Sequence, residues 1–316
     1  MIPDRVFVGI DVSKNRFDVH FHPGGERLAV PNEAAAVAAL ARRLRSMRPV
    51  AIGLEASGGY ERGLARRLHA AGLAVYVLAP AAVRHFARAL RRPAKTDPID
   101  AAMIARYLEL AVDELSPYAP DPRIERLDAL VTHRRRLAGE ASTLRGQMDT
   151  IDEPTVCRMI KARLATLRMG MLTLDKAIRQ TIAECPAMTA LFKTLVAVKG
   201  VGPVLAATLI AGLPELGRIG AKAVASLVGV APHARQSGAT DRHGRCSGGR
   251  APIRAVLYMA VLSAIKAKAP HIEPFYQRLR QNGKPFKLAI TAAMRKFITI
   301  LNAIVRDAAS FQIQAP

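Results

Sequence analysis

The sequence predicts an α/β domain at the N-terminus, followed by a helical insertion and a basic, mainly α C-terminal region. Apolar, β-branched runs alternate with Ala-rich helical patterns over roughly the first third of the chain, which is typical of strands joined by helices. Prolines at 117, 120 and 122 then precede about sixty residues of helical pattern. We expect domains at residues 1–115, 116–186 and 187–316.

The first three predicted strands form an antiparallel meander. Val6–Ile10 is apolar, Arg16–His22 alternates apolar and polar residues, and Glu26–Val30 returns after the turn Pro23-Gly24-Gly25. The elements that follow are a helix at 33–47 capped by Asn32, a strand at 50–55, a helix at about 60–71 and a strand at 73–78. The pattern is therefore a hairpin-based meander followed by βαβ units.

Two of these strands end on a carboxylate. Asp11 follows the first strand and Glu55 closes the fourth. Asp97 and Asp100 stand three residues apart at the start of a helical pattern, so both face the same way. Ligands bind beyond the carboxyl ends of strands in open α/β sheets. The four acids therefore suggest a metal site, although an Asp pair at a helix start also serves simply to complement the helix dipole.

The charge of the chain indicates a polyanionic partner. Forty-seven Lys and Arg against twenty-five Asp and Glu give a formal net charge of +22 and a pI near 10.8. Nucleic acid is the first candidate. Apolar runs such as 73–83 and 255–265 are too short to cross a membrane, and the N-terminus lacks the pattern of a signal peptide, so we expect a cytoplasmic protein without a membrane partner.

The cysteines indicate neither disulfides nor structural zinc. Cys157, Cys185 and Cys246 are odd in number and widely spaced, with no CxxC pair.

The helical insertion predicts a hairpin or a dimer stalk. Its two arms are separated by Asp152-Glu153-Pro154. The second arm carries an apolar stripe of the coiled-coil kind, at Leu164, Leu167, Met171, Leu174, Ile178 and Ile182.

The basic charge is concentrated in the C-terminal region. Residues 187–316 contain eighteen Lys and Arg but four acids. Residues 195–209 predict helix, turn and helix, a helix-hairpin-helix in which Lys199, Gly200 and Gly202 approach a phosphate. A tight structural turn between two helices is the alternative.

A segment rich in Gly, Ser, Thr and His, residues 229–254, predicts a long functional loop. Ser237 lies in its middle and is a candidate nucleophile, since arginines and a metal can stabilise the charge that develops on a phosphodiester. Ser247 competes, although it is more typical of a helix cap. The candidate phosphate-binding arginines are Arg235, Arg242, Arg245, Arg250 and Arg254.

Several motifs together resemble one family. GIDVSK, GLEASGGYE and KTDPIDAAMIARY, and later GVAP, QSG, GGR and GKPFKLAITAAMRKFITILNAIVR, occur in the order found in DEDD-type insertion-sequence transposases, which are related to pilin-gene invertases. The resemblance implies a ribonuclease-H-like fold, similar to Holliday-junction resolvases, with a coiled-coil insertion used for assembly. It implies that Asp11, Glu55, Asp97 and Asp100 bind Mg²⁺ or Mn²⁺ and that Ser237 is the nucleophile.

The function expected from this resemblance is DNA recombination through a covalent phosphoserine. Its expected partners are DNA, a noncoding bridge RNA and further copies of the chain, as a dimer or tetramer, with the protein cytoplasmic and nucleoid-associated when acting. Two alternatives stay open. A Holliday-junction-type endonuclease or a DNA invertase is one, and a non-catalytic nucleic-acid-binding protein, which needs the charge alone, is the other.

Overall fold

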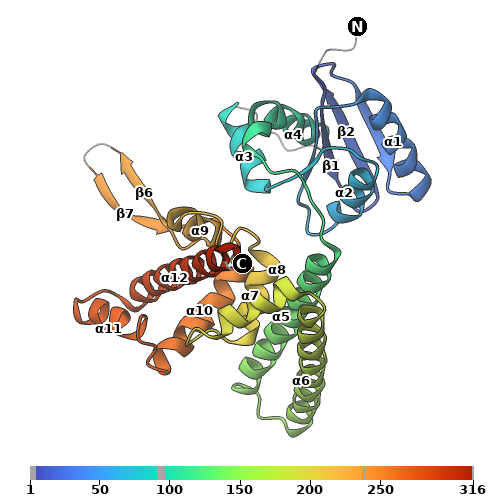
Figure 1. Ribbon diagram of the computed structural model, residues 1–316. Coiled ribbons are helices and arrows are strands. Elements are labelled where there is room, and N and C mark those ends of the chain that lie inside the picture. The colour runs from blue at the N-terminus through green and yellow to red at the C-terminus, as the bar shows by residue number, and fades with distance from the viewer. Residues whose placement is uncertain (1–4, 91–96, 238–239, 315–316) are drawn as a thin grey trace. The chain divides into compact units, whose positions relative to one another are not determined.

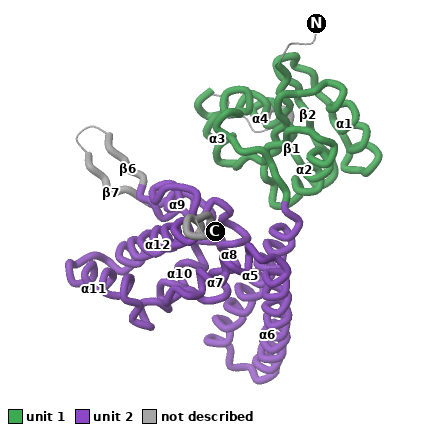
Figure 2. Tube along the Cα trace, in the orientation of Figure 1, with its two compact units in different colours: residues 1–120 green, residues 121–316 purple. Residues whose placement is uncertain are grey.

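The computed structural model divides the chain into two compact units, residues 1–120 and 121–316 (Figure 2). It describes residues 5–90, 97–237 and 240–314, and for 97–99, 233–245 and 309–314 it describes the backbone only. The predicted boundary near residue 116 falls in the coil that precedes Asp121.

Unit 1 is built on a mixed five-stranded sheet (Figure 1). Its strands are β1 (Phe7–Val12), β2 (Arg16–His22), β3 (Arg27–Pro31), β4 (Ala51–Glu55) and β5 (Val75–Leu78). In the order β3-β2-β1-β4-β5, the first three strands are antiparallel neighbours and β1, β4 and β5 are parallel. This arrangement confirms the predicted meander followed by βαβ units.

Helices cover both faces of this sheet. They are α1 (Ala34–Met47), α2 (Glu61–Ala70), α3 (Pro80–Ala89) and α4 (Asp97–Ala111), followed by the 3₁₀ turn η1 (Val112–Glu114). Leu44 of α1 and Leu68 of α2 share one core with Val8 and Ile10 of β1. Met103, Ile104 and Leu108 of α4 share a second core with alternate residues of the strands, on the opposite face.

One predicted helix cap is wrong. The N-cap position of α1 is Glu33, which makes no side-chain cap hydrogen bond. Asn32 instead donates its side-chain amide to the Lys14 carbonyl oxygen at 3.0 Å. Its side chain therefore ties the start of the helix segment to the β1–β2 turn.

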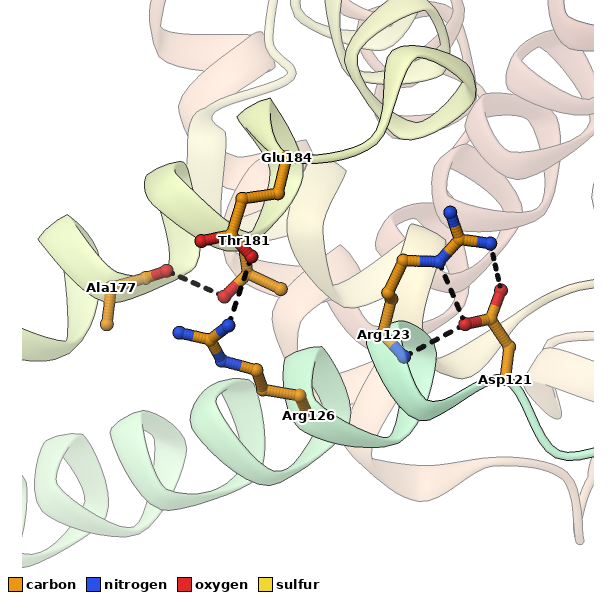
Figure 3. Close-up of polar contacts among 6 residues, drawn as sticks. All are labelled: Asp121, Arg123, Arg126, Ala177, Thr181 and Glu184. Carbon is orange, nitrogen blue, oxygen red and sulfur yellow. Dashed lines mark hydrogen bonds and ion pairs between the residues drawn. The ribbon is translucent and has the colours of Figure 1, made fainter.

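Unit 2 begins with a helical hairpin, as predicted. Its arms are α5 (Pro122–Met148) and α6 (Pro154–Ala183). Figure 3 shows the open end of the hairpin, where Asp121 accepts from the Arg123 backbone N–H at 2.9 Å as the cap of α5. Nearby, Arg126 on α5 donates to Glu184, just beyond α6, at 3.0 Å. The pKa of Asp121 lies below its ordinary value, chiefly because the Arg123 side chain donates to it.

The remaining helices of unit 2 pack around one buried core. They are α7 (Pro186–Val196), α8 (Pro203–Gly212), α9 (Ala221–Val228), α10 (Ala251–Lys266), α11 (Glu273–Gln281) and α12 (Phe286–Gln314). Leu127 and Val131 of α5 belong to this core as well. The hairpin therefore shares a compact unit with the C-terminal helices.

Helix α12 contains an apolar stretch that is longer than the runs at 73–83 and 255–265. Within α12, Phe286–Ala308 is long and apolar enough to cross a membrane. Ile290, Phe297 and Leu301 on this stretch are buried in the core of unit 2. Its apolar character is accounted for, at least on that side, by packing against the other helices.

The predicted loop at 229–254 is not a loop throughout. It contains two antiparallel strands, β6 (Pro232–Ser237) and β7 (Thr240–Cys246), which pair with each other (Figure 1). The prediction was wrong because the polar composition of the segment says that it builds no core, whereas an antiparallel pair needs only its own backbone hydrogen bonds. We call β6 and β7 together the arm.

Candidate active site

Asp11 and Glu55 lie on the same face of the sheet, at the carboxyl ends of neighbouring parallel strands. Ile10 on β1 is aligned with Leu54 on β4, so the two acids that follow these residues stand side by side in the register. Alternate residues of a strand face opposite sides. Phe7 contributes to the core under α4, so Asp11, four residues later, faces the α4 side too.

A pair of glycines lets α4 lie directly on this face. Gly9 and Gly53 are aligned in the β1–β4 register. A Cβ at Gly9 would stand 2.0 Å from the Ala101 carbonyl oxygen and 2.5 Å from the Ala105 nitrogen. The backbone of α4 therefore rests on the backbone of β1, which no residue with a side chain allows.

The direction of α4 brings its first turn to the acidic edge. Near its end, the Glu109 carboxylate accepts a hydrogen bond from Nε2 of the His22 ring at 2.8 Å, and His22 is aligned with Phe7 at the start of β1. Ala101 lies over Gly9, closer to the end of the strand. Asp100, half-buried, thus belongs to the same edge as Asp11 and Glu55. Asp97 is the first residue of the helix, and the structure describes its backbone but not its side chain.

The chemistry of these acids fits a hard divalent cation, since Mg²⁺ prefers carboxylate oxygens. Among the described side chains, however, no three His, Cys, Asp or Glu residues lie close enough together to hold one ion. Asp11, Glu55 and Asp100 therefore share an edge and a face without forming a compact ligand set by themselves. Metal binding by all four acids stays a prediction that includes the Asp97 side chain.

The turn after Glu55 is fixed by a buried acid that the sequence interpretation did not single out. Glu61, at the start of α2, accepts from the backbone N–H groups of Ser57 at 3.0 Å and Gly59 at 2.9 Å. Gly58 and Gly59 both have positive φ, of 73° and 113°. The SGGYE part of the motif therefore shapes the turn beside the candidate site, and the carboxylate of Glu61 is already occupied.

Two further polar residues on β2 face α4 and were missed. Asp18 stands directly opposite Asp11 in the β1–β2 register and pairs with Arg16 at 3.1 Å. His20, opposite Gly9, is buried, and its Nδ1 has no hydrogen-bond partner among the residues that the structure describes. Burial, then the charges of Arg27 and His22, lowers the pKa of His20. The period-2 pattern of Arg16–His22 predicts which residues share a face, but not that the face meets α4.

The candidate nucleophile Ser237 lies in unit 2, on the arm. It is the last residue of β6 and is paired with Thr240, the first residue of β7. Arg235, Arg242 and Arg245 lie on the same two strands, and Arg235 is aligned with Arg242. The side chains of these four residues lie outside the description. The backbone nevertheless places Ser237 at the distal end of the arm.

Two arginines, Arg250 and Arg254, make hydrogen bonds close to where the arm joins the helices of unit 2. We call these two residues the clasp, and the end of the arm nearest to them the foot. Arg250 donates to both carboxylate oxygens of Glu215 at 2.6 Å and to the Gly212 carbonyl at 2.9 Å. Arg254 donates to the Gly248 carbonyl at 2.7 Å. Burial raises the pKa of Glu215, but the hydrogen bonds from Arg250 outweigh it, so that pKa lies below its ordinary value. Both guanidinium groups thus have partners within the protein, and their contact with nucleic acid stays a prediction.

The two helices predicted around the Gly-Val-Gly turn are present as α7 and α8, which are joined by residues 197–202. Gly200 has φ of 100°, and a Cβ there would stand 2.5 Å from the Ala264 Cβ. Gly202 precedes α8 as its N-cap, with no atom within 4 Å of an added Cβ, and Lys199 is exposed. Gly200 is therefore needed for packing against α10, whereas the open side of Gly202 leaves room for a ligand. Binding of phosphate at Lys199, Gly200 and Gly202 remains a prediction.

The comparisons with known proteins agree with this arrangement. Residues 8–151, which span unit 1 and α5, match the family described as "DEDD_Tnp_IS110: Transposase". Residues 193–277, which include the arm and its clasp, match "Transposase IS116/IS110/IS902 family". The pilin gene-inverting proteins of Moraxella bovis and Moraxella lacunata are each 26% identical over 96% of both chains. With the acids at the sheet edge, the arm and both matches in the expected order, the chain carries both transposase domains of the IS110/IS116/IS902 family, whose members are enzymes that act on DNA.

Proposed function

We propose that this transposase recombines DNA by transesterification, with Ser237 as the nucleophile and Asp11, Glu55, Asp97 and Asp100 as the ligands of Mg²⁺ or Mn²⁺. The observation that carries the proposal is the shared edge of unit 1. Two strand-end acids and the first turn of α4 meet on one face, and the glycine pair allows the helix to lie there. We take this unit to be a ribonuclease-H-like domain, because the strand order and the placement of the acids agree with that fold.

The place of Ser237 supports its assignment. It lies at the distal end of a two-stranded arm, away from the foot that Arg250 and Arg254 hold. A residue at the tip of an arm is suited to reach a scissile phosphate bound elsewhere, because the rest of the arm bridges the distance. The acids and Ser237 lie in different units, so the reaction requires that the two units cooperate on one phosphate, within one chain or between copies in a dimer or tetramer.

The proposed step is a phosphoryl transfer. The Ser237 oxygen forms a bond to phosphorus and loses its proton to water, while the bond from phosphorus to a deoxyribose oxygen breaks and that oxygen takes up a proton. The divalent ion, when bound, neutralises phosphate charge and stabilises the attacking or leaving oxygen. Because the phosphodiester is kept as a phosphoserine, a second DNA hydroxyl can attack it and rejoin the strand without another energy source.

The test is covalent retention of DNA. Protein is incubated with labelled DNA that contains candidate element ends and Mg²⁺, then denatured, and the label on the polypeptide is measured. We expect label with the unchanged protein and with Ser247→Ala, the matched serine of the same segment, but none with Ser237→Ala or Asp11→Asn. Cleavage that persists without label in Ser237→Ala would instead identify a resolvase-type endonuclease, and unchanged activity in Asp11→Asn would contradict the metal assignment.

A noncoding bridge RNA completes the proposal, by resemblance to the family. The high positive charge of the chain is consistent with a second polyanion beside DNA. We expect an RNA encoded by the element to copurify with the protein, and we expect strand transfer between element and target to require it. Ribonuclease treatment before the reaction checks this, with heat-inactivated ribonuclease as the control.

DNA inversion is the second candidate. The relatives found are named pilin gene-inverting proteins and match nearly the whole chain. A plasmid with two inverted element ends separates the two outcomes, because inversion reorients the intervening segment whereas transposition moves the element to a new site.

A further inference from the structure

A basic cleft in unit 2 lies apart from the sites described above. It has a volume of about 510 Å³ and lies where α9 and α11 both pack against α12. Four cations line it and no acid does: Lys222, Arg278, Arg295 and Lys296. We call this feature the α9–α12 cleft. Among the residues that the structure describes, none of the four forms an ion pair with a carboxylate.

An aromatic ring holds two of these cations in place. The Lys296 ammonium nitrogen lies 4.5 Å from the centre of the Phe275 ring, and the Arg278 guanidinium carbon lies 5.6 Å from it. Both contacts lie within the range of a cation–π attraction. Like charges that gather around one ring repel each other unless an anion joins them, so the cluster is suited to bind one.

The cleft lies near the foot of the arm. Cys246, the last residue of β7, lines one cavity together with Arg254 of the clasp and with Thr291 and Met294 of α12. Arg295 of the cleft directly follows Met294 in the chain. The positive charges of Arg295 and Arg254 accordingly oppose the burial that raises the pKa of the Cys246 thiol.

We propose that the α9–α12 cleft binds the phosphodiester backbone of the DNA substrate, next to the segment that the arm carries to the reacting phosphate. This inference rests on the proposed function for the identity of the ligand. DNA is favoured because the cleft adjoins the arm that carries Ser237. The contact is independent of sequence, since a cluster of Lys and Arg contacts phosphates and reads no base edges.

The test compares the salt dependence of DNA binding in full-length variants. Lys222→Gln combined with Arg278→Gln removes two exposed cations of the cleft. Lys161→Gln combined with Arg168→Gln removes two exposed cations of α6 and is the matched control. Binding to a fluorescent duplex is measured by anisotropy, without divalent metal so that no chemistry is involved. Each phosphate contact contributes about 0.9 to the slope of log affinity against log salt.

We expect the cleft variant to lose about 1.8 units of this slope, so that the ratio of wild-type to variant affinity falls roughly 12-fold between 50 and 200 mM salt. The control variant loses less than half as much, and Lys222→Arg with Arg278→Lys restores the slope. The loss is the same for two unrelated DNA sequences. Equal slopes in the cleft and control variants would overturn the proposal, provided that thermal unfolding shows both folded.

The same measurement is repeated with an RNA duplex of the same sequence. A change of slope with RNA but not with DNA would overturn the assignment to the DNA substrate. The covalent-retention test is independent of this binding experiment. Absence of label on the wild-type protein would refute the phosphoserine chemistry without affecting the binding result. Unchanged slopes with normal label would refute the cleft alone.

Discussion

Replacing Gly9 by Ala tests whether the glycine pair Gly9 and Gly53 sets the position of α4 on the sheet. The added Cβ would lie 2.0 Å from the Ala101 carbonyl oxygen and 2.5 Å from the Ala105 nitrogen, both of them backbone atoms of α4. Neither atom can rotate away as a side chain does. The helix must therefore move outward by about 1 Å or more, since close-packed interiors leave no spare volume.

The expected cost follows from this displacement. Overpacking a core usually costs about 1–3 kcal/mol, and a clash with backbone belongs at the upper end, so we expect Gly9→Ala to lower the free energy of unfolding of unit 1 by about 3 kcal/mol. A shift of about 1 Å in catalytic groups can also lower a rate by about 10²-fold. Asp97 and Asp100 move with α4, so covalent retention of DNA should fall more than stability alone explains.

Two other glycines provide graded controls. A Cβ at Gly53 would meet the side chains of Ile104 and Leu108 at 2.8 Å, and these can adjust, so we expect Gly53→Ala to cost about 1 kcal/mol. Gly63 in α2 has no atom within 4 Å of an added Cβ, and Gly63→Ala should stabilise its helix by up to about 1 kcal/mol.

The measurement is denaturant unfolding combined with hydrogen exchange of β1 and α4 amides, because a chain of two units need not unfold in one step. Exchange reports unit 1 specifically. The reasoning is refuted if Gly9→Ala matches the wild type in exchange protection and DNA retention, or if the order of effects among the three glycines is reversed.

Two further predictions concern ion pairs. The pKa of Glu215 is lowered in the folded protein, so the ionised carboxylate stabilises the fold. This contribution is fully present above the ordinary pKa of 4.5 and is lost as the pH falls through the lowered pKa. Glu215→Gln weakens the contact with Arg250 and should therefore lower the melting temperature at neutral pH by more than at about pH 3. In the hairpin, Arg134 pairs with Asp175 at 2.5 Å with both side chains mostly buried. Arg134→Gln should cost about 1–3 kcal/mol, whereas Arg163→Gln, which breaks an exposed pair, should cost under about 1 kcal/mol in the same urea titration. Equal melting shifts at both pH values, or equal costs for the two arginines, would contradict these assignments.

Much of unit 1 could be predicted from the sequence because its signals are local. Strand periodicity, turn residues and helix stops each depend on neighbours within a few positions. Gly72, with φ of 76°, ends α2 just before β5 for this reason. The acids at the strand ends were likewise visible, since strand direction and the position of Asp11 and Glu55 follow from the pattern alone.

The arm shows where local signals fail. Its residues have neither an apolar face nor a strong strand propensity, so their composition resembles that of a loop. The pairing of β6 with β7 comes from backbone hydrogen bonds between the two strands, and the foot is fixed by Glu215, which lies 35 residues before Arg250. No short window of sequence contains both partners of that clasp.

The sequence by itself determined the order of elements, the family motifs, the excess of positive charge and the residues that we propose for phosphoryl transfer. The tertiary structure decided which of them meet: that Gly9 and Gly53 align beneath α4, that Asp18 stands opposite Asp11, and that cations from three helices line one cleft. The physical reason is that periodicity and propensity act along the chain, whereas close backbone approach and charge clustering depend on packing between segments far apart in it.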